Sequence, residues 1–171
     1  YDHFAMEEVR RSGDCVVMRC PGCDDLEAFL DCAQTGTQVG IWRSFEAEKE
    51  TPVVTVAFRG TELGEIRDVL TDIAANQQLL GCEDLLGLDC PAPGAQASVH
   101  SGFLRAFLSV REDLTSQLRD LGVLDSDSVT PVVFTGHSLG GALCIISALD
   151  LAGDIGKGRM QVVTFGSPRI G

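Results

Sequence analysis

The sequence predicts an α/β fold with a mainly parallel central sheet and helices on both faces. Short β-branched runs alternate along the chain with longer segments of helical periodicity, an order typical of strands joined by helical crossovers. One of these runs is apolar at successive positions, as expected for a strand covered on both faces. The 171 residues match the size of one domain with a substantial core, and 44% hydrophobic and 22% charged residues are ordinary for a globular protein.

In the first third of the chain we expect two strands. Residues 1–36 are expected to be irregular or helical, because apolar residues between positions 26 and 30 have helical spacing. Residues 37–43 predict a strand, and the nearly continuous β-branched run at residues 52–58 predicts a second one inside the sheet.

Two helices are predicted in the middle of the chain. Residues 61–73 have apolar and charged positions on opposite sides of a short amphipathic helix, and a loop-like stretch rich in Gly, Pro and Asp follows up to residue 98. A core-facing helix is predicted from Phe103 to Leu121, and Gly122 ends it. Its apolar positions recur at spacings of three and four: Phe103, Phe107, Val110, Leu114, Leu118 and Leu121.

A serine lies where a strand at residues 131–135 meets an apolar helix at residues 139–152, in the run Gly-His-Ser-Leu-Gly. Ser138 in such a turn occupies a sharp, strained elbow, with glycines on either side where a Cβ would collide. This pattern predicts a nucleophilic serine. The alternative is an ordinary strand-to-helix turn with a capping serine. Residues 160–165 predict the last strand.

The charge balance excludes some partners. The chain has 13 basic and 25 acidic side chains and a net charge of −12, so nucleic acid and anionic membrane surfaces are not expected to bind it. No apolar run is long enough for a transmembrane segment.

Seven cysteines raise the question of metal or redox chemistry. Four of them lie between positions 15 and 32 and form an N-terminal group. The outer spacings of this group differ from the two tight pairs that are typical of zinc sites, so the sequence favours buried thiols or a local disulfide over a zinc site or a redox dithiol. No metal is predicted. Cys82 and Cys90 are candidates for a disulfide in an oxidising compartment, and Cys144 for a buried small hydrophobe. The N-terminal group consists of Cys15, Cys20, Cys23 and Cys32.

Four motifs occur in the order and with the spacing of a known family: FRGT at residues 58–61, VHSGF at 99–103, TGHSLGGA at 135–142 and TFGSPRIG at 164–171. Through them the chain resembles the class 3 lipases of the α/β-hydrolase fold. The resemblance covers residues 37–171 and leaves residues 1–36 as a Cys-rich N-terminal extension.

The resemblance implies a lipase that hydrolyses acyl esters of glycerolipids through an acyl-enzyme on Ser138, without a cofactor. It also implies an oxyanion hole formed by Thr61 and Leu139, and a lid at roughly residues 62–80 that turns toward lipid at a lipid–water interface. A fixed surface helix is the alternative to a lid. Rival functions are a phospholipase A1, thioesterase or peptidase on the same fold, and a non-catalytic relative that binds lipid or a partner. The oligomeric state is not predicted.

The acid and base of a catalytic triad are not expected within these residues. In this fold they follow the serine in the chain, and no histidine follows Ser138. Asp150 is expected to be a solvated residue of the elbow helix, and His137 to be structural, while His3 and His100 lie upstream. We therefore expect a fragment that ends after the Gly-Ser-Pro-Arg motif and is inactive alone. The likeness of residues 37–43 to plant-type members favours an intracellular compartment, cytoplasm or plastid, over secretion.

Overall fold

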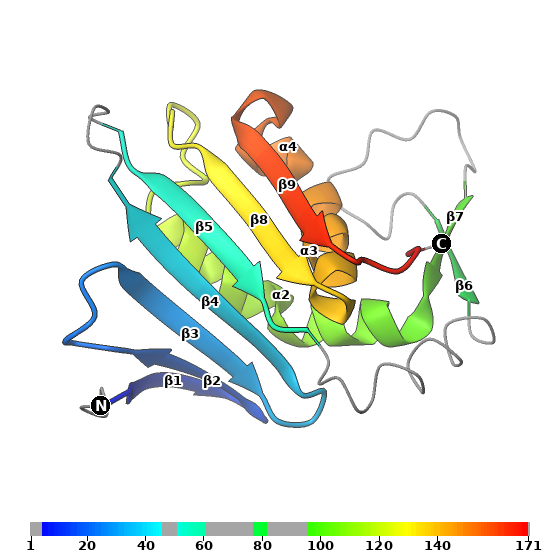
Figure 1. Ribbon diagram of the computed structural model, residues 1–171, viewed down its shortest axis with the longest axis horizontal. Helices are drawn as coiled ribbons and strands as arrows, with labels where there is room; N and C mark the ends of the chain where they lie inside the picture. Colours follow the sequence, from blue (N-terminus) through cyan, green and yellow to red (C-terminus); the bar gives the residue numbers. More distant parts are fainter. Residues whose placement is uncertain (1–4, 46–50, 61–76, 82–95, 171) are drawn as a thin grey trace.

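The computed structural model describes residues 5–45, 51–60, 77–81 and 96–170. Within these residues the strands and helices follow one another in an α/β order (Figure 1). The elements are β1 (Glu7–Ser12), β2 (Cys15–Arg19), β3 (Leu26–Cys32), β4 (Thr37–Ser44), β5 (Val53–Phe58), β6 (Gln77–Gly81), β7 (Gln96–His100), α2 (Ser101–Asp120), β8 (Val132–His137), α3 (Leu139–Asp150), α4 (Ala152–Ile155), the 3-10 helix η2 (Lys157–Arg159) and β9 (Met160–Phe165).

Seven of the described strands form one sheet in the order β1-β2-β3-β4-β5-β8-β9. The strands from β1 to β5 pair with antiparallel neighbours, whereas β5, β8 and β9 are parallel to one another. The α/β fold is therefore confirmed, but the sheet is mixed, and the parallel arrangement holds only for its C-terminal strands. Parallel neighbours need a crossover, which α2 and α3 provide, whereas β1 to β4 are joined by tight turns.

The prediction that residues 1–36 are irregular or helical was wrong, because the described residues of this segment form the strands β1, β2 and β3. In β3 the buried residues are Ala28, Leu30 and Cys32, an alternation with a period of two. The helical spacing of apolar residues between positions 26 and 30 concealed this pattern. These strands hydrogen-bond onto β4 and extend the same sheet.

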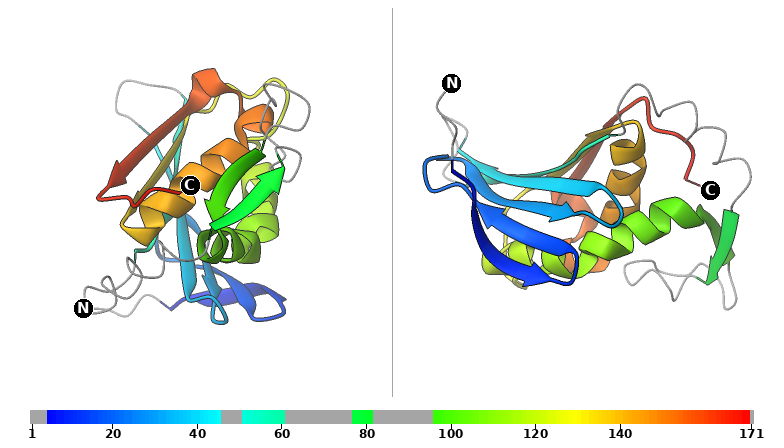
Figure 2. Two further views of the ribbon diagram at one scale, coloured as in Figure 1. Left: turned by 90° about the vertical axis from the view of Figure 1, so that its right-hand side faces the viewer. Right: turned by 90° about the horizontal axis from the view of Figure 1, so that it is seen from below.

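The predicted helices and strands around the C-terminal half are confirmed. Helix α2 ends before Gly122, which has a φ of +69°, and strand β9 has the predicted bounds. The apolar positions of α2 face the core, with Phe107 1% exposed and Leu114 and Leu118 fully buried. Among the described helices, α2 and α3 lie on the same face of the sheet (Figures 1 and 2).

The opposite face of the sheet is less covered than predicted. Along β5, Val54, Val56 and Phe58 are buried and the intervening residues are half-buried. On β9, Val162 is 41% exposed and Phe165 is 60% exposed. The described residues thus cover one face of β5 fully but leave every residue of β9 at least partly exposed, and the prediction of helices on both faces does not hold among them.

Several predictions between β5 and α2 fall on residues outside the described ranges. They include the amphipathic helix at residues 61–73, Thr61 itself, and the cysteines at positions 82 and 90. The loop predicted up to residue 98 is interrupted by β6 and β7, which pair antiparallel with each other. Residues 77–80, the end of the expected lid, therefore belong to a strand.

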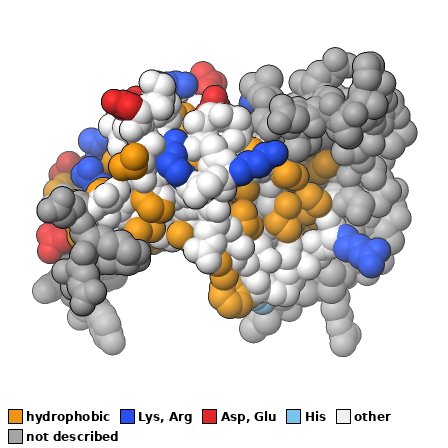
Figure 3. All heavy atoms as spheres, turned by 90° about the horizontal axis from the view of Figure 1, so that it is seen from above, with side chains coloured by type: hydrophobic (Ala, Val, Ile, Leu, Met, Phe, Trp, Pro, Cys, Tyr) orange, Lys and Arg blue, Asp and Glu red, His pale blue; other side chains and the backbone are white. Residues whose placement is uncertain are grey.

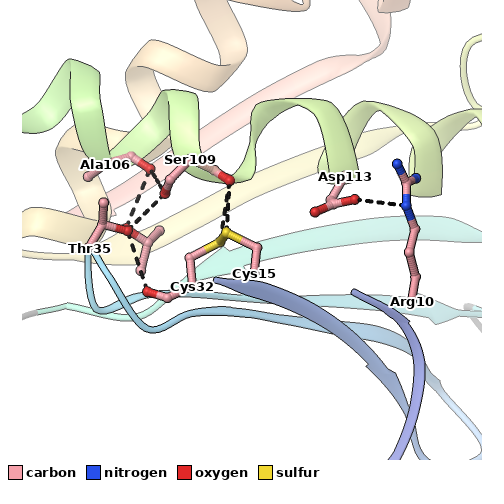
Figure 4. The surroundings of a disulfide bond; sticks show 8 residues. Arg10, Cys15, Cys32, Thr35, Ala106, Ser109 and Asp113 are labelled. Atoms are coloured by element: carbon pink, nitrogen blue, oxygen red, sulfur yellow. Dashed lines mark hydrogen bonds and ion pairs between the residues drawn. A yellow bond between two sulfur atoms is a disulfide. The ribbon is translucent and has the colours of Figure 1, made fainter. Parts of the chain in front are cut away.

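Side-chain links join the N-terminal strands to α2 (Figure 4). A disulfide connects Cys15 and Cys32 on paired positions of β2 and β3, with a Cα–Cα distance of 4.0 Å, and its two sulfur atoms lie 3.1 and 3.3 Å from the carbonyl oxygen of Ser109 on α2. Arg10 Nε on β1 lies 3.4 Å from Asp113 Oδ1 on α2. The expectation of a local disulfide is confirmed.

A second disulfide closes the turn after β2, between Cys20 and Cys23. On the face of the molecule seen in Figure 3, acidic and basic side chains are interspersed among hydrophobic ones, so the net negative charge is not concentrated there. Among the described helices, none has the length and hydropathy of a membrane-spanning segment.

Candidate active site

Ser138 is held in a strained backbone conformation between β8 and α3. Its φ of 53° and ψ of −124° make it the only non-glycine residue with a positive φ in the described part of the chain. Its N–H donates a hydrogen bond of 2.9 Å to the carbonyl oxygen of Phe165 at the end of β9. Such conformations persist only where surrounding contacts enforce them, and they cluster at functional sites.

Glycines enforce the turn because backbone atoms occupy the places where side chains would begin. A Cβ on Gly136 would lie 2.5 Å from the carbonyl carbon of Gly140, and a Cβ on Gly140 would lie 2.4 Å from the carbonyl oxygen of Phe58 on β5. A Cβ on Gly141 would lie 2.8 Å from Cβ of Ser167. The predicted reason for Gly136 and Gly140 is confirmed, and their contacts bring the backbones of β5, β8 and α3 together.

The loop after β5 also reaches the elbow. A Cβ on Gly60 would lie 2.4 Å from the carbonyl oxygen of His137, the residue before Ser138. Gly60 is therefore packed on the backbone of the elbow. Thr61, the predicted oxyanion residue, follows Gly60 in the chain and lies outside the described residues.

Leu139 is the first residue of α3 and is half-buried, directly after Ser138, which is 8% exposed. The first N–H groups of a helix have no partner within the helix, and the helix dipole places partial positive charge there. The N–H of Leu139 therefore lies directly after Ser138 with no partner inside α3.

Asp150 does not have the predicted environment. It is 4% exposed, not solvated, and Arg111 of α2 binds it with two hydrogen bonds, Nε–Oδ2 of 2.8 Å and NH2–Oδ1 of 3.0 Å. Sequence spacing placed it on the helix correctly but did not reveal the facing arginine. Its carboxylate links α2 to α3, a structural role.

Two of the three histidines lie in the described residues. His100 is 8% exposed at the start of α2, and its ring centre is 4.7 Å from that of Phe103. The backbone N–H of His100 donates to the carbonyl oxygen of Ile170, so the motifs at residues 99–103 and 164–171 meet here. His137 is exposed on the elbow.

Cys144 lies beneath the elbow on α3. It is fully buried, and a Cβ on Gly136 would lie 3.0 Å from its Sγ. Burial raises the pKa of its thiol to about 12, so it stays protonated at neutral pH. The prediction of a small buried hydrophobe is confirmed.

A cavity of about 290 Å³ opens beside Leu139. Its walls come from the turn between β3 and β4, the first turns of α2 and the start of α3. Arg105 lines it, a residue that sequence analysis did not single out, because a lone arginine on a helix forms no motif. The segments that form the walls of this cavity are far apart in the sequence and meet only in the folded chain.

The parallel strands β5, β8 and β9, with a strained serine between β8 and α3, define an α/β-hydrolase fold. The family described as Lipase (class 3) matches residues 55–171. The chain belongs to the class 3 lipase family.

Individual relatives agree with this assignment. Secreted mono- and diacylglycerol lipase 2 of Gibberella zeae is 32% identical over 70% of this chain and 30% of its own length. Phospholipase A1-Igamma2, chloroplastic, of Arabidopsis thaliana is 31% identical over 69% of this chain and 25% of its own length. The crystal structure of a lipase from Rhizopus microsporus var. chinensis has a TM-score of 0.62 and 29% identity, covering 85% of this chain and 45% of that one.

The chain thus spans between a quarter and a half of the relatives compared. Their names point to different compartments. The Gibberella zeae lipase and a 26% identical lipase of Fusarium solani are named as secreted, and the Arabidopsis protein as chloroplastic. The fungal names oppose the predicted preference for an intracellular compartment over secretion, and the plant name agrees with a plastid.

Proposed function

We propose that Ser138 is the nucleophile of a carboxylic ester hydrolase that acts on glycerolipid acyl esters. The observation that carries the proposal is the strained backbone of Ser138, with a φ of 53°, at the junction of a buried parallel strand and a helix. Strain at a serine in this position is the geometry of a nucleophile elbow. Membership of the class 3 lipase family supports the same chemistry.

In the proposed reaction, Ser138 Oγ loses its proton to a base and attacks the carbonyl carbon of the ester. The C–O bond to the glycerol then breaks, the alcohol leaves with a proton, and the acyl group remains on Ser138. Water attacks the acyl-enzyme and releases the fatty acid. We assign neither the base nor the triad acid to a described residue, since Asp150 is held by Arg111.

We propose that the backbone N–H of Leu139 and the N–H of Thr61, with its hydroxyl, stabilise the oxyanion of each tetrahedral intermediate. The position of Leu139 at the start of α3 supports its part. The packing of Gly60 on His137 supports that of Thr61, the next residue in the chain. Loss of one oxyanion donor typically costs about 3 kcal/mol of activation free energy. If the hydroxyl donates, Thr61→Val lowers kcat about a hundredfold and Thr61→Ser retains most of it.

A serine-directed fluorophosphonate tests the nucleophile in the full-length gene product. We expect one label on Ser138, located by peptide mass spectrometry and absent from Ser138→Ala. Ser126→Ala, which removes an exposed serine from a surface turn, serves as the control and keeps the label. A folded protein that hydrolyses esters without labelling Ser138 would refute the assignment.

Residues 1–171 expressed alone should show negligible turnover, because no histidine follows Ser138 in them. Hydrolysis of a short-chain ester by this segment, abolished by Ser138→Ala, would mean that one of its own three histidines acts as the base. Absence of all hydrolysis from the full-length protein would favour the non-catalytic alternative, a protein that binds lipid or a partner.

A further inference from the structure

We propose that the cavity beside Leu139 receives the phosphodiester head group of a glycerophospholipid whose acyl ester reacts at Ser138. We call it the Arg105 pocket; its walls include Gln34, Thr35, His100, Phe103, Arg105 and Leu139. This proposal rests on the proposed function and names the substrate class of the same site.

The Arg105 pocket is next to the elbow. Leu139, which forms one wall, directly follows Ser138, and the first turns of α2 form another wall. In a glycerophospholipid the phosphate and the acyl esters are carried by the same glycerol. A head group in this pocket would therefore leave an acyl ester of the same molecule close to the nucleophile.

Internal contacts hold the walls of the Arg105 pocket in place. Thr35 Oγ1 lies 2.8 Å from Ser109 Oγ and donates to Thr37 Oγ1 over 2.9 Å, which fixes the turn between β3 and β4 against α2. The buried ring of His100 packs against Phe103 and against Gly102, where an added Cβ would lie 3.0 Å from Cε1. Such a cavity is formed before a ligand arrives.

The charge of the Arg105 pocket favours an anion. None of the described residues that line it carries a carboxylate, although the chain as a whole has a net charge of −12. Arg105 is exposed and forms no hydrogen bond or ion pair within the described part of the molecule. A guanidinium is always charged and binds phosphate oxygens through two parallel hydrogen bonds. The side-chain amide of Gln34 adds further donors.

An acyl chain is the less suitable occupant of the Arg105 pocket. It would remove water from the guanidinium of Arg105 and the amide of Gln34 without offering them acceptors, which costs free energy. Phe103 and Leu139 supply apolar surface that suits the glycerol carbons between phosphate and ester. The polar groups of the walls therefore favour a charged phospholipid over a neutral acylglycerol.

Binding without turnover tests the head-group site directly. The full-length Ser138→Ala protein is titrated with glycerophosphocholine, which has the phosphodiester but no acyl chain, by isothermal calorimetry. We expect saturable binding that Arg105→Gln weakens about tenfold, the effect of losing one charged hydrogen-bonding partner. Arg119→Gln, which removes the same charge from an exposed position at the end of α2, is the matched control and should bind like the parent.

Three outcomes of this titration would overturn the proposal. They are no binding of glycerophosphocholine, equal weakening by Arg105→Gln and Arg119→Gln, and inorganic phosphate binding as tightly as glycerophosphocholine, which would indicate a site for free anions. A circular dichroism spectrum and melting temperature for each variant show whether it is folded.

A second measurement concerns selectivity. The ratio of phosphatidylcholine to diacylglycerol hydrolysis by the full-length enzyme, in mixed vesicles of both lipids, should fall about tenfold in Arg105→Gln and partly recover in Arg105→Lys. An unchanged ratio would contradict the assignment. If Ser138 is never labelled but glycerophosphocholine still binds through Arg105, then the proposed function fails while the head-group site stands.

Discussion

The two ends of the sheet are stabilised by different interactions. On the elbow side, formed by β5, β8, β9 and α3, backbone contacts between glycines and a buried apolar core fill the space, and Val132 and Phe134 are fully buried. On the hairpin side, formed by β1, β2 and β3, all six residues of β1 are exposed. There the disulfide of Cys15 and the ion pair of Arg10 connect the strands to each other and to α2.

This difference indicates which side tolerates change. Close packing at Gly136 and Gly140 leaves no room for an added Cβ, and it holds Ser138 and the start of α3 with little freedom to move. On the hairpin side, β2 and β3 contribute Val17 and Leu30 to the core, whereas β1 buries none of its residues and depends on a few specific links. Substitutions should therefore affect the proposed site on the elbow side and only stability on the hairpin side.

The largest effect should come from Gly140→Ala on the elbow side. Its Cβ would lie 2.4 Å from the backbone oxygen of Phe58, which cannot rotate away. We expect a loss of about 3 kcal/mol in the free energy of unfolding, measured with urea, and loss of fluorophosphonate labelling of Ser138. Gly158→Ala is the control, since nothing lies within 4 Å of its added Cβ. Normal labelling of Gly140→Ala would show that the elbow is less tightly packed than described.

On the hairpin side, replacing Cys15 and Cys32 together by serine should lower the free energy of unfolding by about 2–3 kcal/mol, because their disulfide closes a loop with a sequence separation of 17. Labelling of Ser138 should stay unchanged. The double serine variant of Cys20 and Cys23, with a separation of 3, should lose about half as much. Impaired labelling in the first variant would mean that the two sides are coupled through α2.

A smaller effect is expected for Arg10→Met. Asp113 is 5% exposed, and the substitution leaves its carboxylate without this cation, at a cost of about 1 kcal/mol in the free energy of unfolding. Arg11→Met, next to it on β1, removes a cation that pairs with the exposed Glu8 and should change stability very little. Equal effects of the two substitutions would contradict a specific link between β1 and α2.

At neutral pH the raised pKa of Cys144 does not change the free energy of unfolding, because the thiol is protonated in both the folded and the unfolded state. At alkaline pH the raised pKa lowers the free energy of unfolding. The folded thiol has a pKa of about 12, against an ordinary value of 9.0, so above pH 9 the unfolded state loses a proton that the folded state keeps. The stabilising contribution is complete below pH 9 and is lost as the pH rises toward 12. The stability difference between the parent and Cys144→Ala should therefore shrink with alkalinity, in urea unfolding between pH 8 and about 10.5. A constant difference would show that the thiol is accessible to water.

Much of the elbow side could be predicted from local patterns. The apolar run of β8, the glycines around Ser138 and the periodicity of α2 are each patterns among neighbouring residues, so the sequence alone located them, although Gly140 packs on the distant Phe58. The hairpin side could not be predicted in the same way. In β3, apolar residues at helical spacing occur on a strand, because pairing with β2 and β4 outweighs local preference.

Two polar features of the site region also could not be predicted from local sequence patterns. Asp150 was expected in solvent, but Arg111 comes from another helix, 39 positions earlier in the chain. The Arg105 pocket joins the turn after β3, the start of α2 and the start of α3, which are far apart in sequence.

The sequence by itself determined the α/β order, the strained serine and the family motifs, since these are encoded in neighbouring residues. Only the tertiary structure decided the strand directions at the N-terminal end, the partner of Asp150 and the charge of the cavity beside Leu139. Each of these depends on which distant segments meet, and that outcome is set by the packing of the whole chain.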